Sequence, residues 1–176
     1  TGAYPSILSS RQPAPNTGIY DSPLTVSCQR NFIVLLTDGL PTSDGASNTA
    51  IETLIGGACP GTENATSGRC LEEIAEYMYE NDLRPSLPQV QNVTTYTIGF
   101  ALTGADAAAV TKLRNTAAGA GGVFYEAKDT ATLTTVLTNI VSLVRFTLGD
   151  DDELAPYPEQ VAERFDAWLL QQQNAG

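Results

Sequence analysis

The fold class of this chain is decided by the stretch FIVLLTDG, residues Phe32–Gly39. Five apolar residues in succession, closed by a Thr-Asp-Gly turn signal, are typical of a central parallel strand that is buried on both faces. Gly39 and Pro41 end the strand, because both residue types favour turns over continued strand. We therefore expect Asp38 to lie just beyond the carboxyl end of a buried strand.

Strands and helices alternate downstream of this stretch. β-branched and aromatic residues predict strands at Val93–Phe100 and Val123–Ala127. Apolar residues at helical spacing predict helices, the last of them capped by Asp129, at Thr49–Gly57, Cys70–Asn81, Ala105–Ala118 and about 130–144. This order predicts an α/β fold with a Rossmann-like parallel sheet flanked by helices. Since three strands make a small sheet, we expect part of the domain to lie outside this chain.

The chain divides into three segments by composition. Residues 1–27 are rich in Pro, Ser, Thr and Gly and predict a linker, and residues 28–140 hold the α/β pattern. Residues 141–176 contain an acidic run and then an amphipathic C-terminal helix with Val161, Phe165, Trp168 and Leu169 on one face. The only methionine is Met78, so we expect the chain to be a piece of a longer protein.

Composition excludes several function classes. A formal net charge of −11 argues against binding to nucleic acid, because the chain would be repelled by phosphates. The chain has no histidine, which excludes a Ser-His-Asp triad, a Cys-His pair and a His-ligated zinc site within it. No apolar run approaches the roughly 18–20 residues of a membrane span. We therefore expect neither nucleic-acid binding nor membrane insertion, and none of these histidine-dependent sites.

Cys59 and Cys70 bracket a Gly/Thr/Asn-rich loop. If the protein is exported, a local disulfide is the natural interpretation, contributing roughly 2–3 kcal/mol. Cys28 would then need a partner elsewhere. The alternative is three reduced, half-buried thiols. A zinc site is disfavoured, because the spacing is wrong and the chain has only three cysteines.

The stretch FIVLLTDG resembles the strand-and-loop signature of von Willebrand factor A (VWA) domains. Tyr96–Phe100 resembles the next strand of that family and Gly121–Ala127 the last one. The match narrows to PilY-type type IV pilus tip proteins through Ser22-Pro23, Cys28-Gln29 and Pro41–Asp44. The resemblance covers roughly Tyr20–Ile140. It implies a partial VWA domain that serves adhesion or pilus assembly, with pilus subunits or a host-surface ligand as partners. It also implies export to the periplasm or cell surface.

The same resemblance implies a divalent cation, usually Mg²⁺, at the carboxyl edge of the sheet. Asp38 falls on the position of a ligand, or of a residue that bonds to a ligand. The family's site also needs a DxSxS loop and a Thr from a middle loop, and neither occurs upstream of Asp38. We therefore expect the cation in the intact parent domain and none in this chain. Alternatively, Asp38 is a turn residue that bonds backbone N–H groups, with Thr42 and Asp44 as loop-capping residues.

A second resemblance lies at the C-terminal end. Residues 142–146, 152–157, 164–165 and 168–169 are similar to the helical docking tail of the motor subunit of type I restriction enzymes. This similarity leaves three interpretations open. The chain is a genuine fusion, or it is a chimera or restriction-subunit fragment without function of its own, or residues 141–176 are an ordinary acidic linker and a helix that packs on the exposed sheet.

Overall fold

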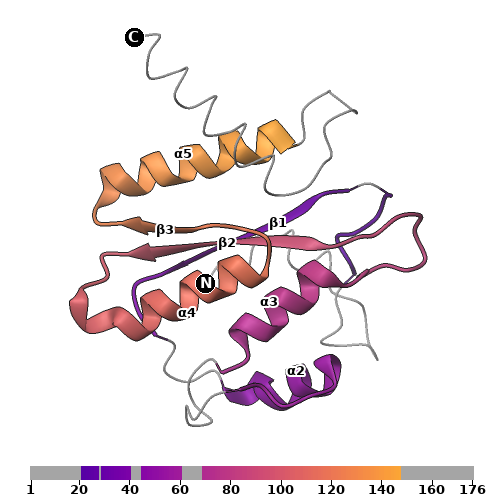
Figure 1. Ribbon diagram of the computed structural model, residues 1–176. Helices are drawn as coiled ribbons and strands as arrows, with labels where there is room; N and C mark the ends of the chain where they lie inside the picture. Colours follow the sequence, from indigo (N-terminus) through magenta and orange to yellow (C-terminus); the bar gives the residue numbers. More distant parts are fainter. Residues whose placement is uncertain (1–20, 28, 41–44, 61–68, 148–176) are drawn as a thin grey trace, which may run out of the picture.

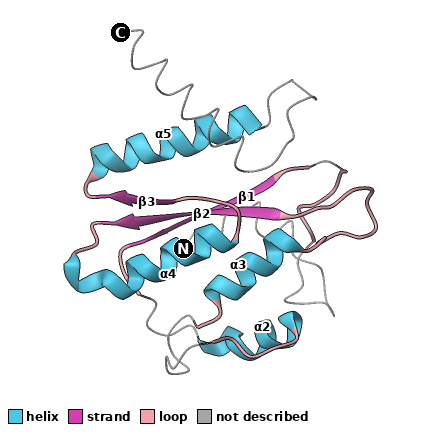
Figure 2. Cartoon of the chain, in the orientation of Figure 1, coloured by secondary structure: helices cyan, strands magenta, loops and turns pink. Residues whose placement is uncertain are grey.

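The computed structural model describes residues 21–27, 29–40, 45–60 and 69–147. It confirms the predicted fold class, an α/β Rossmann-like arrangement in which helices flank a three-stranded parallel sheet (Figure 1 and Figure 2). The predicted C-terminal helix lies outside the described residues, as do Cys28, Thr42 and Asp44.

The sheet has the order β1-β2-β3, and both pairs of neighbours are parallel. Its strands are β1 (Asn31–Thr37), β2 (Val93–Phe100) and β3 (Phe124–Ala127). The helices are η1 (Gly45–Ser47), α2 (Asn48–Ile55), α3 (Leu71–Glu80), η2 (Gly104–Asp106), α4 (Ala107–Gly119) and α5 (Thr130–Thr147). All strands and the four α-helices lie within a few residues of the predicted segments.

The strand register assigns residues to the two faces of the sheet. Val34 pairs with Tyr96 and Leu36 with Ile98, and laterally paired residues share a face. This face is covered by α5, whereas α3 and α4 cover the opposite one (Figure 1). On the opposite face Thr97 Oγ1 donates a hydrogen bond of 2.8 Å to Leu113 O of α4, so a buried hydroxyl has its partner.

The hydrophobic core lies between α5 and the sheet. Its buried members are Tyr96, Ile98, Ala127, Val136, Ile140 and Leu143. The predicted segment boundary at residue 140 therefore falls inside α5, which continues to Thr147. Since Leu143 is only 7% exposed, residues 141–147 belong to the α/β domain.

The prediction that β1 is a central strand buried on both faces is wrong for the described part of the chain. There β1 is an edge strand that pairs only with β2. Ile33, on one face, is 39% exposed, while Val34 and Leu36, on the other, are 42% and 48% exposed. An apolar run shows that a strand needs cover on both faces, but it does not show which segment supplies that cover.

The turn before β3 brings Gly122 against the backbone of β2. A Cβ atom at Gly122 would lie 2.1 Å from Thr95 O, which is closer than atoms of these types approach. Glycine is therefore required here for close packing between the turn and the central strand.

We predict that Gly122→Ala lowers the free energy of unfolding by about 2–4 kcal/mol, because β2 cannot move without disturbing both neighbours. Urea denaturation followed by circular dichroism measures the change. Gly57→Ala is the matched control, because a Cβ there meets nothing within 4 Å. Equal effects of the two substitutions would show that the contact with Thr95 is unimportant.

Burial raises the pKa of Tyr96 to about 12, and the neighbouring Tyr125 adds to the shift. In the unfolded chain the phenol ionises near its ordinary pKa of 10.0. Between these two values the unfolded state releases a proton that the folded state keeps, so rising pH favours unfolding.

We predict that the wild-type chain loses about 1.4 kcal/mol of stability between roughly pH 9 and pH 11 through this residue, and that Tyr96→Phe lacks this part of the decline. Urea unfolding at the two pH values, compared between the two proteins, measures it. An identical decline in both proteins would contradict the assignment to Tyr96.

Candidate functional site

The candidate site is the carboxyl edge of the sheet, where all three parallel strands end together. The register aligns Thr37 of β1 with Gly99 of β2, and Gly99 with Glu126 of β3. Asp38 follows Thr37 directly and is exposed. In an open α/β sheet, ligands bind beyond this edge, and Asp38 lies there, directly after β1.

The turn that carries Asp38 is held by its neighbour. Thr37 Oγ1 donates to Gly39 O at 2.9 Å and accepts from Gly39 N at 3.3 Å. Within the part of the chain that the structure describes, no hydrogen bond or ion pair engages the Asp38 carboxylate. The Thr37 hydroxyl thus closes the turn, which is the role that the alternative interpretation assigned to Asp38.

Two further carboxylates follow β2 and β3, and both are engaged. Asp106 Oδ2 accepts from Thr103 N and Thr103 Oγ1, each at 2.9 Å. Asp129 Oδ1 accepts from Thr132 N and Thr132 Oγ1, each at 2.8 Å. In both cases the backbone N–H bond, followed by the hydroxyl bond, lowers the pKa of the aspartate. Their position and partners make them turn and helix-start residues.

The backbone at this edge also carries an unusual conformation. Ala101, directly after β2, has a φ of 53°, which alanine adopts only at a cost in free energy. Its N–H donates to Ala127 O at 2.8 Å and so extends the contact between β2 and β3. The sequence offers no signal for this residue, because alanine is not typical of a left-handed turn.

These observations bear on cation binding at the edge. Mg²⁺ takes six oxygen ligands in a near-octahedral arrangement, and Ca²⁺ takes six to eight. Among the described residues, Asp106 and Asp129 are held in their own turns, while Asp38 after β1 and Glu126 on β3 are exposed. The described residues therefore offer too few oxygens to hold such an ion tightly.

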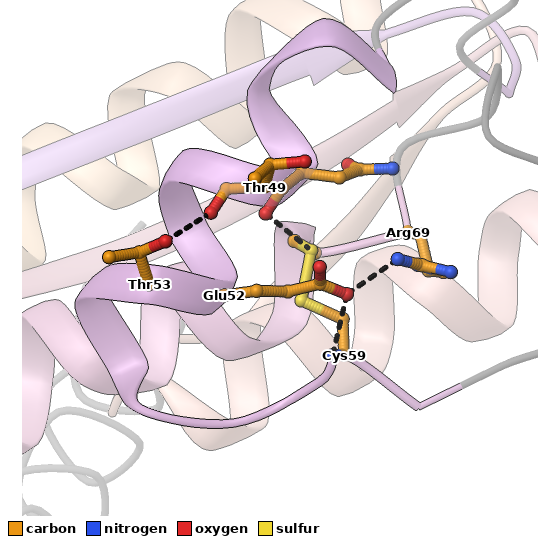
Figure 3. Close-up of polar contacts among 7 residues, drawn as sticks. Thr49, Glu52, Thr53, Cys59 and Arg69 are labelled. Carbon is orange, nitrogen blue, oxygen red and sulfur yellow. Dashed lines mark hydrogen bonds and ion pairs between the residues drawn. A yellow bond between two sulfur atoms is a disulfide. The ribbon is translucent and has the colours of Figure 1, made fainter.

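Cys59 and Cys70, the pair that the sequence suggested, are joined by a disulfide and are both buried. Glu52 of α2 lies beside it: its Oε1 accepts from Cys59 N at 3.2 Å and pairs with Arg69 Nη2 at 2.5 Å (Figure 3). Cys70 Sγ also lies 3.9 Å from Asn48 O. A disulfide sulfur has no hydrogen to donate, so the last contact is one of packing. Together these contacts fix α2 to the residues that lead into α3.

This disulfide site has one alternative chemistry. A carboxylate oxygen of Glu52 and the two sulfur atoms lie within 4.8 Å of one another, a spacing that metal ligands also show. Sulfur atoms bonded to each other are not thiolates, and the Glu52 carboxylate already pairs with a cation. The arrangement is therefore structural.

We predict that reduction of this disulfide lowers the free energy of unfolding by about 2–3 kcal/mol, because the unfolded chain regains the freedom of a short loop. Guanidinium denaturation with and without a thiol reductant measures the loss. The double substitution Cys59→Ser with Cys70→Ser serves as control and should respond little to reductant. A wild-type chain that is equally stable under both conditions would contradict the prediction.

Comparisons with known proteins name no family for this chain. No protein-family model matches it, and no curated protein matches it. A crystal structure of an uncharacterized membrane-spanning protein from Vibrio fischeri matches 66% of this chain and 48% of that chain, with 19% sequence identity and a TM-score of 0.39. The chain thus spans about half the length of that protein, and similarity at this level supports no inference. Each helix among the described residues is too short or too polar to span a lipid bilayer.

Proposed function

We propose that this chain is a non-catalytic binding module, the C-terminal half of a VWA-type domain from a PilY-type pilus tip protein. One observation carries the proposal: Asp38 is exposed at the carboxyl edge of a parallel sheet, and its turn is closed by hydrogen bonds between Thr37 and Gly39. A carboxylate in that position is suited to a ligand that binds beyond the sheet.

The chemistry of the described residues supports binding over catalysis. Strongly perturbed pKa values often mark catalytic groups, but here each shift has a structural cause. Turn hydrogen bonds account for Asp106 and Asp129, and burial accounts for Tyr96. The chain also has no histidine, the commonest general base.

In this proposal Mg²⁺ or another divalent cation belongs to the intact parent domain, where Asp38 contributes one ligand or a bond to one. The DxSxS loop and the middle-loop Thr supply the remaining oxygens. Pilus subunits or a host-surface ligand are the partners, in the periplasm or at the cell surface. The disulfide between Cys59 and Cys70 supports export, because such bonds persist in oxidising compartments.

The restriction-subunit interpretation receives less support. Its first matching residues, 142–146, lie within α5, and Leu143 among them is buried against the sheet. A side chain that completes the α/β core belongs to the domain that it packs in. The proposal therefore treats the C-terminal residues as part of the same protein.

We predict that the 176-residue chain binds Mg²⁺ no more tightly than about 1 mM, because Asp38 lies at the carboxyl edge without the oxygens of the DxSxS loop and the middle-loop Thr. The parent domain that includes the DxSxS loop and the Thr should bind Mg²⁺ and should co-sediment with purified type IV pili in its presence. Asp38→Asn in that domain should weaken Mg²⁺ binding by about 10-fold or more. Calorimetry measures Mg²⁺ binding by the chain, the parent domain and the Asp38→Asn variant. Co-sedimentation measures binding of the parent domain to pili.

Asp106→Asn in the parent domain is the matched control, because this carboxylate lies at the same edge but is held by Thr103. It should leave Mg²⁺ binding unchanged. Tight binding by the 176-residue chain would refute the incomplete site. A parent domain that binds Mg²⁺ but ignores pili would refute the proposed partner.

A further inference from the structure

The α5 side of the sheet has an apolar surface that the described chain leaves uncovered. It consists of Val34 and Leu36 on β1, which are 42% and 48% exposed, and Leu137 and Val141 on α5, which are 40% and 55% exposed. We call these four residues the β1 face. Beside them Phe32 stacks on Tyr96 with ring centroids 6.3 Å apart, so the β1 face continues directly into the core.

Leu137 and Val141, the two residues of the β1 face that belong to α5, lie on the side of the helix toward β1. This helix follows β3 and runs back antiparallel to it, on the face opposite α4 (Figure 1). Its core positions are Val136, Ile140 and Leu143. With about 100° per residue in a right-handed helix, Leu137 and Val141 fall on the flank that faces β1. The apolar stripe of α5 therefore extends beyond the residues that pack in the core.

The segment that fits this surface follows α5 directly. Residues 148–176 come after Thr147, and within them Val161, Phe165, Trp168 and Leu169 recur at i, i+4, i+7 and i+8. That spacing predicts an amphipathic helix with one apolar face, which needs an apolar surface to pack on. The β1 face is such a surface, and it lies on the same face of the sheet as α5.

The connecting residues are long enough for this return. Residues 148–158 span up to about 36–40 Å when extended, at about 3.3–3.6 Å per residue. α5 has 18 residues and is therefore about 27 Å long, at about 1.5 Å per residue. The connection also contains the acidic run Asp150–Glu153, which suits a solvated linker and not a packed element.

We propose that residues 159–171 fold back within the same chain as an amphipathic helix and cover the β1 face. Such a helix covers a face of β1 and leaves its free edge open to a further strand. Pairing of two copies is disfavoured as the source of cover, because each copy carries a formal charge of −11. A tethered segment is present at a high effective concentration, and residues 159–171 carry a net charge of only −2, from three acidic residues and one arginine.

Trp168 is the only tryptophan, so fluorescence excited at the red edge of tryptophan absorption, where the seven tyrosines do not absorb, reports on this segment alone. In the native chain we expect emission at shorter wavelength than in denaturant. Leu36→Asp should return the emission to the wavelength of the unfolded chain. Ile33→Asp is the matched control: it puts the same charge on the opposite face of the same strand, at a site 39% exposed, and should leave the emission unchanged.

Val141→Asp on α5 is a second test variant for the case in which Leu36→Asp does not fold, as judged by far-UV circular dichroism. Emission of the native chain at the unfolded wavelength would overturn the proposal. So would blue-shifted emission that neither Leu36→Asp nor Val141→Asp alters. Emission that shifts on dilution, together with a dimer in sedimentation velocity, would assign the cover to a second copy instead.

Discussion

Burial of β2 on both faces and along both edges is the constraint on which the rest of the structure depends. Ile98 contacts the α5 layer and Thr97 bonds to α4, and both side chains are fully buried. Because β1 and β3 each pair with this one strand in parallel, their carboxyl ends must meet at one edge. The position of Asp38 is thus a consequence of strand pairing, and no local interaction of its own is needed to place it.

The sequence predicted β2 and the helices well, because their apolar periodicity is strong and local. The prediction that β1 is a central, buried strand failed for a physical reason. Continuous apolar residues indicate that a strand is normally covered on both faces, but they do not indicate which segment covers it. The requirement for Gly122 in the turn before β3 could not be predicted either. Thr95 O leaves no room for a side chain there, and such a contact between segments has no signal in local composition.

The candidate site was predicted only in part. The place of Asp38 followed from a turn signal after a strand, but the role of Thr37 did not, since its hydroxyl could equally have faced solvent. The left-handed Ala101 depends on the register between β2 and β3 and has no local signal. The loop closed by Cys59 and Cys70 was within reach of the sequence, because two cysteines so near in the chain have few other partners.

The disulfide also determines how the chain would respond to a pulling force. Tension that enters through α2 passes from Cys59 to Cys70 across a Cα–Cα distance of 5.3 Å and continues into α3. The residues between them bear no load, although they would otherwise extend to about 36–40 Å at about 3.3–3.6 Å per residue. The fully stretched chain is therefore shorter by roughly 30 Å than its number of residues implies. The ends of the loop stay together while the rest of the domain is under tension.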